Sequence, residues 1–207
     1  SAAAIYGARA SNGVVLITTK RGQSQKTKIN LSSYYGFQQA ERKLDMINAK
    51  QWKEYRNDMA INDGGLPPYS EEDIQNNPID TDWLDEVFQT APVANVELSA
   101  SGGNDKTQFF VSGNYVSEEG ILIGTSYERL NGRLNLDHRI SNNVKIGASL
   151  GITHSKTNRV EGDQSLNGPL PNAITLPPIY PVYNEEGTFN EDGPYANPVS
   201  IAEQAIN

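Results

Sequence analysis

The sequence predicts a mainly β fold, built from antiparallel strands that each present one apolar and one polar face. The clearest evidence is a hairpin at 130–154, in which apolar residues alternate with polar residues or glycine on both sides of a turn at 141–143. Side chains alternate between faces along a strand, so this hairpin has one apolar side. Each arm has about eleven residues, the length of a tilted strand that crosses a bilayer. The alternating apolar residues are Leu130, Leu134, Leu136, Ile140, Val144, Ile146, Ala148, Leu150 and Ile152.

The same alternation predicts three further strands, at 29–37, 94–101 and 107–116, although Phe110 and Val116 interrupt it in the last of them. Together with 130–140 and 144–154 these make five predicted strands. Short and long connections between strands, in alternation, are typical of an up-and-down membrane barrel. Here the short connections are 102–106 and 141–143, and the long ones are 38–92, 117–129 and the stretch from 156 onward.

Other parts of the chain lack this alternation. The β-branched run at 13–19 is apolar at consecutive positions, which predicts a strand buried on both faces. Two short helices are predicted within 38–92. The first begins after Asn48, with Gln51 at capping-box spacing, and the second begins at Thr81. The second helix would bury Trp83, Leu84, Val87 and Phe88, whereas 158–207 shows no periodic element.

Composition narrows the class of protein. The chain has 207 residues, of which 37% are hydrophobic and 20% charged, enough for one ordinary folded domain. Its net charge of −8 argues against nucleic-acid binding and against docking on anionic lipid through a basic patch. Without cysteine there are no disulfides, thiolate metal sites or cysteine nucleophiles. Because it starts with Ser1 and shows no leader, we expect an internal piece of a longer protein.

No residues form a catalytic, cofactor-binding or metal-binding constellation. His138 and His154 lie on predicted strands without a partner at metal-ligand spacing. The acidic stretches at 184–187 and 190–193 lack the ligand pattern of a calcium loop and are better explained as turns. The remaining carboxylates lie near predicted helix starts, where negative charge suits the helix dipole. These are Glu71, Glu72, Asp73, Asp80, Asp82 and Asp85.

Residues 1–22, which read SAAAIYGARASNGVVLITTKRG, resemble the end of the plug domain of TonB-dependent outer-membrane transporters. More narrowly, they resemble the SusC/RagA nutrient-uptake family of Bacteroidota. Residues 118–124 and 129–137 are similar to that family's early barrel strands, and 44–52 to its first long insertion. The resemblance implies part of a large antiparallel transmembrane barrel with an N-terminal plug. Such a barrel has about 22 strands in the family, of which this chain supplies about five.

The resemblance also implies a domain organisation and a function. Residues 1–25 would end the plug, 26–157 would form the first barrel strands with the helical loop 38–92, and 158–207 would form a long extracellular loop. The whole protein would lie in the outer membrane and import oligosaccharides or peptides rather than act as an enzyme. A SusD-like lipoprotein would be its partner, and the TonB complex would contact a segment outside this chain. No cofactor is implied.

Five residues of the matched stretch carry the family signature, and we expect structural roles for them. Gly7 and Gly13 would permit tight backbone turns, and Arg9 would bind the lumen wall through an ion pair or hydrogen bonds. Tyr6 and Asn12 complete the signature. The apolar strand faces would meet lipid and the polar faces the lumen. Aromatic girdles at the membrane interfaces would include Tyr35, Tyr115 and Tyr127.

The alternative is a soluble β-sandwich, such as a carbohydrate-binding module. In a sandwich, a second sheet about 10 Å away would cover the apolar strand faces. The two hypotheses differ in one observable, namely whether this chain buries the apolar side of its own strands.

Overall fold

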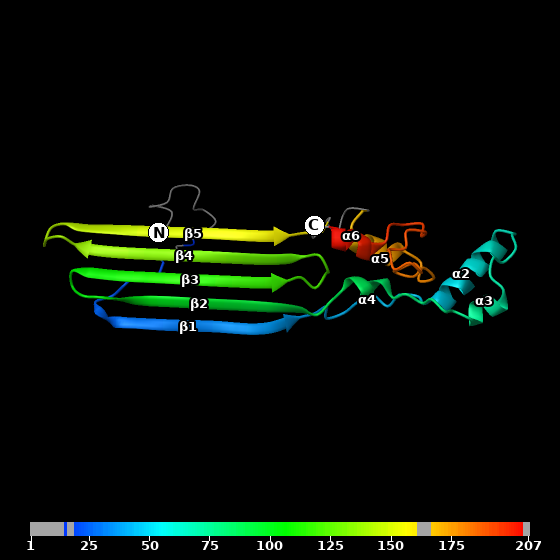
Figure 1. Cartoon of the computed structure of the whole chain (residues 1–207), viewed down its shortest axis with the longest axis horizontal. Coiled ribbons are helices and arrows are strands. Elements are labelled where there is room, and N and C mark those ends of the chain that lie inside the picture. Colours follow the sequence, from blue (N-terminus) through cyan, green and yellow to red (C-terminus); the bar gives the residue numbers. More distant parts are fainter. Residues whose placement is uncertain (1–14, 16–18, 161–166, 205–207) are drawn as a thin grey trace. The chain divides into compact units, whose positions relative to one another are not determined.

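A single five-stranded sheet dominates the structure, a computed structural model that describes residues 15, 19–160 and 167–204 (Figure 1). The strands are ordered β1-β2-β3-β4-β5, so each pairs with its neighbours in sequence as an antiparallel meander. This confirms the predicted mainly β class. The strand bounds are β1 Gln25–Gln38, β2 Ala91–Gly103, β3 Thr107–Glu119, β4 Ser126–Arg139 and β5 Lys145–Asn158.

Each of the five strands predicted from alternation overlaps one of these. The ranges 29–37, 94–101 and 107–116 lie within β1, β2 and β3, whereas 130–140 and 144–154 run one residue too far into the turn between β4 and β5. The connection predicted as long at 117–129 shrinks to 120–125, because strand pairing continues through the polar residues around it. The predicted strand at 13–19 lies largely outside the described residues.

Helix α2 (Ala49–Asn62) begins where the capping box predicts. The Asn48 side chain accepts a hydrogen bond from the Gln51 amide at 2.9 Å, and the Gln51 side chain accepts one from the Asn48 amide at 3.0 Å. This arrangement satisfies two amides that the first helical turn leaves without partners. The carboxylate of Asp80 accepts a third hydrogen bond, from the Ala49 amide at 2.7 Å.

The prediction of only two helices was wrong. Between α2 and α4 (Trp83–Val87) lies a third helix, α3 (Glu71–Gln75), and two more follow the sheet, α5 (Pro169–Thr175) and α6 (Pro198–Gln204). The last two contradict the prediction that 158–207 holds no regular element. These three helices have five or seven residues, too few for a 3.6-residue apolar period to become visible.

The helices share a hydrophobic core. As predicted for the second helix, Trp83, Leu84 and Val87 of α4 are buried, and they pack against α5 and α6. Burial of each such side chain contributes about 1.5–3 kcal/mol. The indole nitrogen of Trp83 donates to the Pro177 carbonyl at 3.0 Å, so its polar atom is satisfied within the core. The other buried members of the core are Ala173, Leu176, Val182 and Val199.

The chain divides into two compact units. Unit 1 comprises residues 1–32, 97–113 and 131–152, and unit 2 comprises 33–96, 114–130 and 153–207. Unit 2 contains all the helices, whereas unit 1 contains the turn between β4 and β5 and the segment that precedes β1. Of the helices in the described parts of the chain, none is long and apolar enough to cross a membrane.

Candidate functional site

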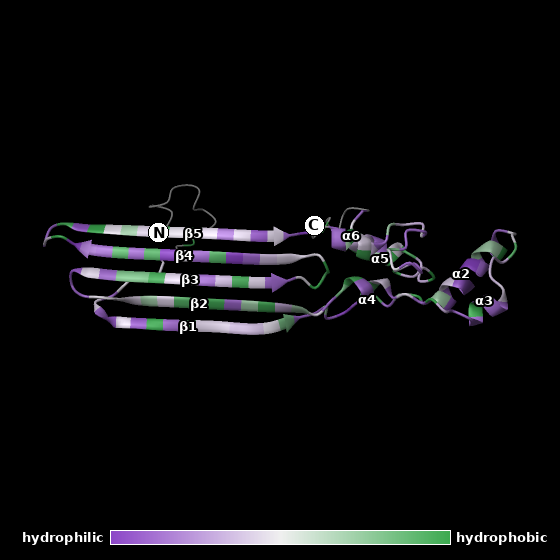
Figure 2. Cartoon of the chain, viewed as in Figure 1, coloured by the Kyte–Doolittle hydropathy of each residue, from purple (hydrophilic) through white to green (hydrophobic). Residues whose placement is uncertain are grey.

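The apolar side of the sheet is exposed and is not covered by other described parts of the chain; we call it the bare face. Figure 2 shows hydrophobic and hydrophilic residues alternating along the strands, as the sequence predicts. Large apolar side chains of one parity remain 38–76% exposed on all five strands and at the two ends of the turn between β4 and β5, and on β1 Tyr34 of the opposite parity is exposed as well. A β-sandwich would bury these side chains under a second sheet, but the described residues form only one. The exposed residues are Ile29, Leu31, Tyr35, Phe37, Val96, Leu98, Val111, Tyr115, Leu130, Leu134, Leu136, Ile140, Val144, Ile146, Leu150 and Ile152.

Side chains of the opposite parity are buried in unit 1. Asn135 is only 1% exposed and Asp137 8%, although both are polar. Phe110, which interrupts the alternation in sequence, is 6% exposed because it lies on this covered side of the sheet. The segment at 20–22 lies against this side, as its contacts with β3 and β4 show.

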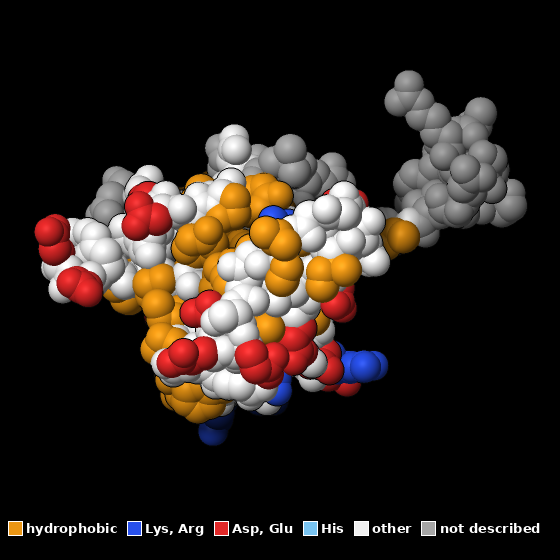
Figure 3. All heavy atoms as spheres, turned by 90° about the vertical axis from the view of Figure 1, so that its right-hand side faces the viewer, with side chains coloured by type: hydrophobic (Ala, Val, Ile, Leu, Met, Phe, Trp, Pro, Cys, Tyr) orange, Lys and Arg blue, Asp and Glu red, His pale blue; other side chains and the backbone are white. Residues whose placement is uncertain are grey.

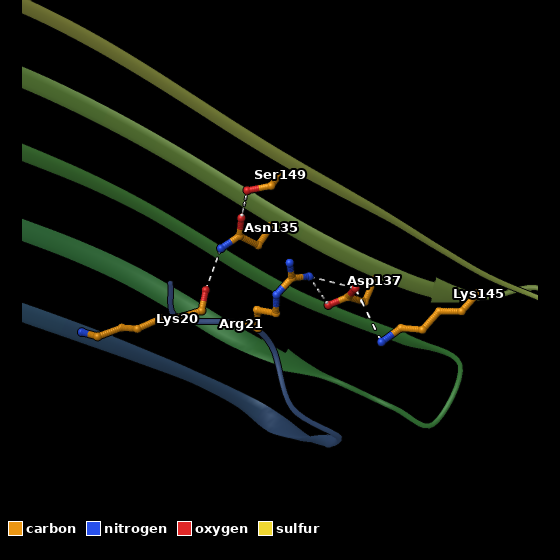
Figure 4. A network of polar contacts seen from close by, with 6 residues as sticks. All are labelled: Lys20, Arg21, Asn135, Asp137, Lys145 and Ser149. Carbon is orange, nitrogen blue, oxygen red and sulfur yellow. Dashed lines mark hydrogen bonds and ion pairs between the residues drawn. The ribbon is translucent and has the colours of Figure 1, made fainter. Parts of the chain in front are cut away.

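An ion-pair network holds that segment (Figure 4). One guanidinium nitrogen of Arg21 donates to both carboxylate oxygens of Asp137, at 3.0 and 3.1 Å. The ammonium of Lys145, on β5, lies 3.6 Å from the same carboxylate. Because a carboxylate that is almost completely buried needs a charged or hydrogen-bonding partner, Arg21 and Lys145 compensate the burial of Asp137.

A second chain of hydrogen bonds runs beside the first (Figure 4). The amide of Asn135 donates to the Lys20 carbonyl at 2.6 Å, and its oxygen accepts from the Ser149 hydroxyl at 2.6 Å. The buried Asn135 side chain therefore links the segment at 20–22 to β4 and β5. Backbone carbonyls without such a partner would be costly to bury.

Gly22 allows the closest approach in this region. A Cβ atom at Gly22 would lie 2.7 Å from the carbonyl carbon of Phe109 and still closer to its backbone nitrogen and oxygen. Real Cβ atoms do not approach a backbone so closely, so only glycine lets the segment lie directly on β3. We call Lys20, Arg21 and Gly22, with their partners Phe109, Asn135, Asp137, Lys145 and Ser149, the junction.

We expect Asn135→Leu to lower the free energy of unfolding by about 1–3 kcal/mol, because it leaves the Lys20 carbonyl and the Ser149 hydroxyl without their partner. Denaturant unfolding of the complete protein in detergent would measure the change. Asn143→Ala, in the exposed turn between β4 and β5, is the matched control and should have no effect. Equal stability of the two variants would contradict a structural role for Asn135.

The predicted signature residues Tyr6, Gly7, Arg9, Asn12 and Gly13 lie outside the described residues. Their roles therefore stay predictions. In the described part, Arg21 makes the kind of contact that we expected of Arg9. The sequence contained a signal for this ion pair. Asp137 is the only acidic residue in the predicted strand 130–140, and Arg21 follows shortly after the apolar run at 13–19.

The predicted girdle tyrosines do not share one face. Tyr35 and Tyr115 lie on the bare apolar side, where the Tyr35 ring packs edge-on against Phe37 at 5.3 Å between centroids. Tyr127 has the opposite parity, and the guanidinium of Arg129 lies over its ring at 5.9 Å. Tyr127 therefore does not fit a girdle that faces lipid.

The histidines and acidic stretches show no metal-binding arrangement. His138, near the end of β4, forms a 2.8 Å hydrogen bond with the Thr107 hydroxyl. The described residues contain no group of three potential ligands that could hold a metal ion. The Asn184 side chain accepts from the Glu186 and Thr188 amides, so the 184–187 stretch forms a turn, as predicted.

All six carboxylates predicted near helix starts contact or lie in a first helical turn: Glu71, Glu72 and Asp73 at α3, Asp82 and Asp85 at α4, and Asp80 at α2. Asp82 caps α4, and Asp73 completes a capping box with Ser70 at the start of α3. Both the hydroxyl and the amide of Ser70 donate to Asp73, and these hydrogen bonds hold the pKa of Asp73 below its ordinary value. Asp80, in contrast, caps α2 from a distant part of the sequence.

The lowered pKa of Asp73 predicts that α3 is less stable in acid. A carboxylate with a lower pKa in the folded state stabilises fully above its unfolded pKa, about 3.9, and loses this contribution as the pH falls through the folded value. We therefore expect the amides of α3 to exchange hydrogen faster as the pH drops below about 4, after correction for intrinsic exchange. Ser70→Ala should weaken this dependence, and an unchanged dependence would contradict the assignment.

Comparison with known proteins relates the whole chain to TonB-dependent receptors. It is 30% identical over 215 residues to TonB-dependent receptor P3 of Formosa agariphila and 32% identical to receptor P26 of the same organism. It is 27% identical over 197 residues to TonB-dependent receptor SusC of Bacteroides thetaiotaomicron. The matches cover 100%, 100% and 94% of this chain but only 20%, 21% and 18% of the relatives. The chain thus spans about a fifth of their length. No family model matches it.

Solved structures support the same fold. The RagAB peptide importer in its "open-open" state superposes with a TM-score of 0.74 at 23% identity, and in its "closed-closed" state with a TM-score of 0.73 at 22% identity. Each match covers 95% of this chain and 26% of the other. The relatives are named as receptors and importers rather than enzymes.

Proposed function

Since this chain belongs to the SusC/RagA-type TonB-dependent receptors, we propose that it forms part of an active transporter in the outer membrane. The transporter imports oligosaccharides or peptides, with energy transmitted by the TonB complex through a segment outside these 207 residues. A SusD-like lipoprotein assembles with it. The observation that carries this proposal is the bare apolar face, which spans all five strands of an antiparallel sheet.

Within this proposal, residues 1–25 end the plug and 26–157 form the first strands of the barrel wall. The loops at 38–92 and 158–207 lie outside the cell. The bare face meets lipid, and the junction holds the end of the plug against the inner side of the wall. The buried polar residues Asn135 and Asp137 on that side support the assignment, because lumenal residues of barrels are polar. Closure into about 22 strands remains a prediction.

Site-directed spin labelling tests the membrane part of the proposal. Cysteines at Ile146, Leu150 and Ile152 of the complete protein in lipid nanodiscs would carry nitroxide labels, with Gly151 as the control on the opposite face. A Cβ at Gly151 meets no other described atom within 4 Å, so a cysteine is accommodated there. We expect the three labels to be relaxed by oxygen, which partitions into lipid, and to be shielded from a water-soluble nickel chelate. Access of the chelate to all three would refute a lipid-facing wall.

Uptake measurements test the transport part. Cells that express the complete protein should accumulate a labelled oligosaccharide or peptide from a screened panel, and inactivation of TonB should abolish the accumulation. Accumulation that persists without TonB would contradict active transport. Together with the spin labels, this distinguishes a membrane protein of another function from a TonB-dependent importer.

A further inference from the structure

An aromatic groove lies between helix α2 and the segments that follow α5, within unit 2. Its volume is about 510 Å³, and a smaller hollow of about 220 Å³ adjoins it and shares Trp52, Tyr55, Thr175 and Pro177. Small-molecule sites typically measure about 300–1,000 Å³ and are mostly apolar, with a few polar groups that orient the ligand. The residues that line the larger groove are Trp52, Tyr55, Arg56, Met59, Thr175, Pro177, Tyr180, Pro194 and Tyr195.

Hydrogen bonds hold one wall of the groove, and a contact between two aromatic rings holds the other. On one side, the Thr81 hydroxyl donates to the Tyr180 carbonyl at 2.7 Å, and Trp83 donates to the Pro177 carbonyl at 3.0 Å. On the other side, the Trp52 ring packs edge-on against the Tyr69 ring at 5.9 Å. The Trp52 ring is therefore held in place before a ligand arrives and loses little conformational entropy on binding.

Arg56 is the only charged residue among those that line the groove. Its guanidinium lies 5.7 Å from the Trp52 ring centroid, and no carboxylate of the described residues forms an ion pair with it. Figure 3 shows hydrophobic and acidic side chains over much of this face and few basic ones. Arg56 is therefore the group in the groove that would bind a negatively charged group of a ligand.

We propose that this groove binds a short oligosaccharide that carries a carboxylate, such as a uronic-acid oligomer. The sugar rings stack on Trp52 and Tyr55, and the carboxylate accepts two hydrogen bonds from Arg56. Guanidinium donors match a carboxylate in this bidentate way. The proposal rests on the proposed function and names the substrate class for it.

The chemistry of the lining favours a sugar over a peptide. Peptides that bind by adding a strand to a sheet edge do so largely through main-chain hydrogen bonds. This groove is lined by aromatic rings and by Pro177 and Pro194, which have no backbone N–H to donate. Flat rings with polar edges instead complement the C–H faces and hydroxyl groups of sugars.

Isothermal titration of the complete transporter in detergent tests the proposal. The probe is galacturonotriose, and its methyl ester serves as the uncharged counterpart. We expect Arg56→Gln to weaken binding of galacturonotriose roughly tenfold to hundredfold and to change binding of the ester little. Tyr55→Ala should weaken binding of both, because Tyr55 is 56% exposed and contributes stacking area rather than packing.

Lys50→Gln is the matched control for the loss of one positive charge. Lys50 lies on the same helix but outside the groove, and its ammonium is 3.9 Å from Glu54. Binding of galacturonotriose should be unchanged in this variant. The proposal is wrong if galacturonotriose does not bind, if Arg56→Gln and Lys50→Gln behave alike, or if trialanine binds instead and depends on Arg56. The last result would assign the groove to peptides.

These outcomes are independent of the proposed function as a whole. If the groove fails to bind the sugar while spin labels at Leu150 and its neighbours are in lipid, the proposed transporter function is retained. Only the proposed substrate class is then rejected. If the labels are exposed to water, the proposed function fails whatever the groove binds.

Discussion

Leu150→Lys is expected to lower the free energy of unfolding in a bilayer by about 2–4 kcal/mol. Leu150 lies near the middle of β5 and its side chain is 61% exposed on the bare face. In the proposed wall this side chain meets hydrocarbon, where an ammonium group loses its hydration. Urea titration of the complete protein in lipid vesicles, followed by the gel-mobility shift that unfolded barrels show, would measure the difference.

The control for this prediction is the next residue. Gly151 has the opposite parity, and a Cβ there meets no atom within 4 Å, so Gly151→Lys adds the same charge on the other face without a clash. We expect its cost to be well below that of Leu150→Lys. If the two substitutions cost the same, or if Leu150→Lys is harmless, the bare face does not meet lipid.

Gly22→Ala is expected to detach the segment at 20–22 from the sheet. The added methyl group would overlap the backbone of Phe109, and a backbone atom of a central strand cannot move aside as a flexible side chain can. Overpacking of this kind costs about 1–3 kcal/mol. Because the Arg21–Asp137 and Lys20–Asn135 contacts depend on the same close approach, they should weaken together.

Limited trypsin digestion measures this detachment through the rate of cleavage after Lys20 and Arg21. Cleavage at these bonds in the complete protein should become roughly tenfold faster or more in Gly22→Ala, consistent with the expected cost. Gly151→Ala, which adds the same methyl group in open space, should be cleaved at the original rate. An unchanged rate in Gly22→Ala would show that the segment does not need its close contact with β3.

Much of the fold could be predicted from local patterns. Alternation located all five strands, and on β2, β3 and β4 their parity separated the bare side from the covered side, because a period of two is a property of the strand itself. The capping box of Asn48 and Gln51 located the start of α2 for a similarly local reason. The helices α3, α5 and α6 were missed because one or two turns are too short to show a period.

The sites depended on contacts between residues far apart in the chain. Asp137 is separated from Arg21 by 116 residues, and the groove joins α2 to residues beyond position 170. By itself, the sequence determined which side chains share a face, since that follows from neighbouring backbone geometry. Only the tertiary structure decided that Gly22 rests on Phe109 and that, within the described part of the chain, no second sheet covers the apolar face and no carboxylate pairs with Arg56. These depend on which distant segments the folded chain brings together, and no local pattern encodes that choice.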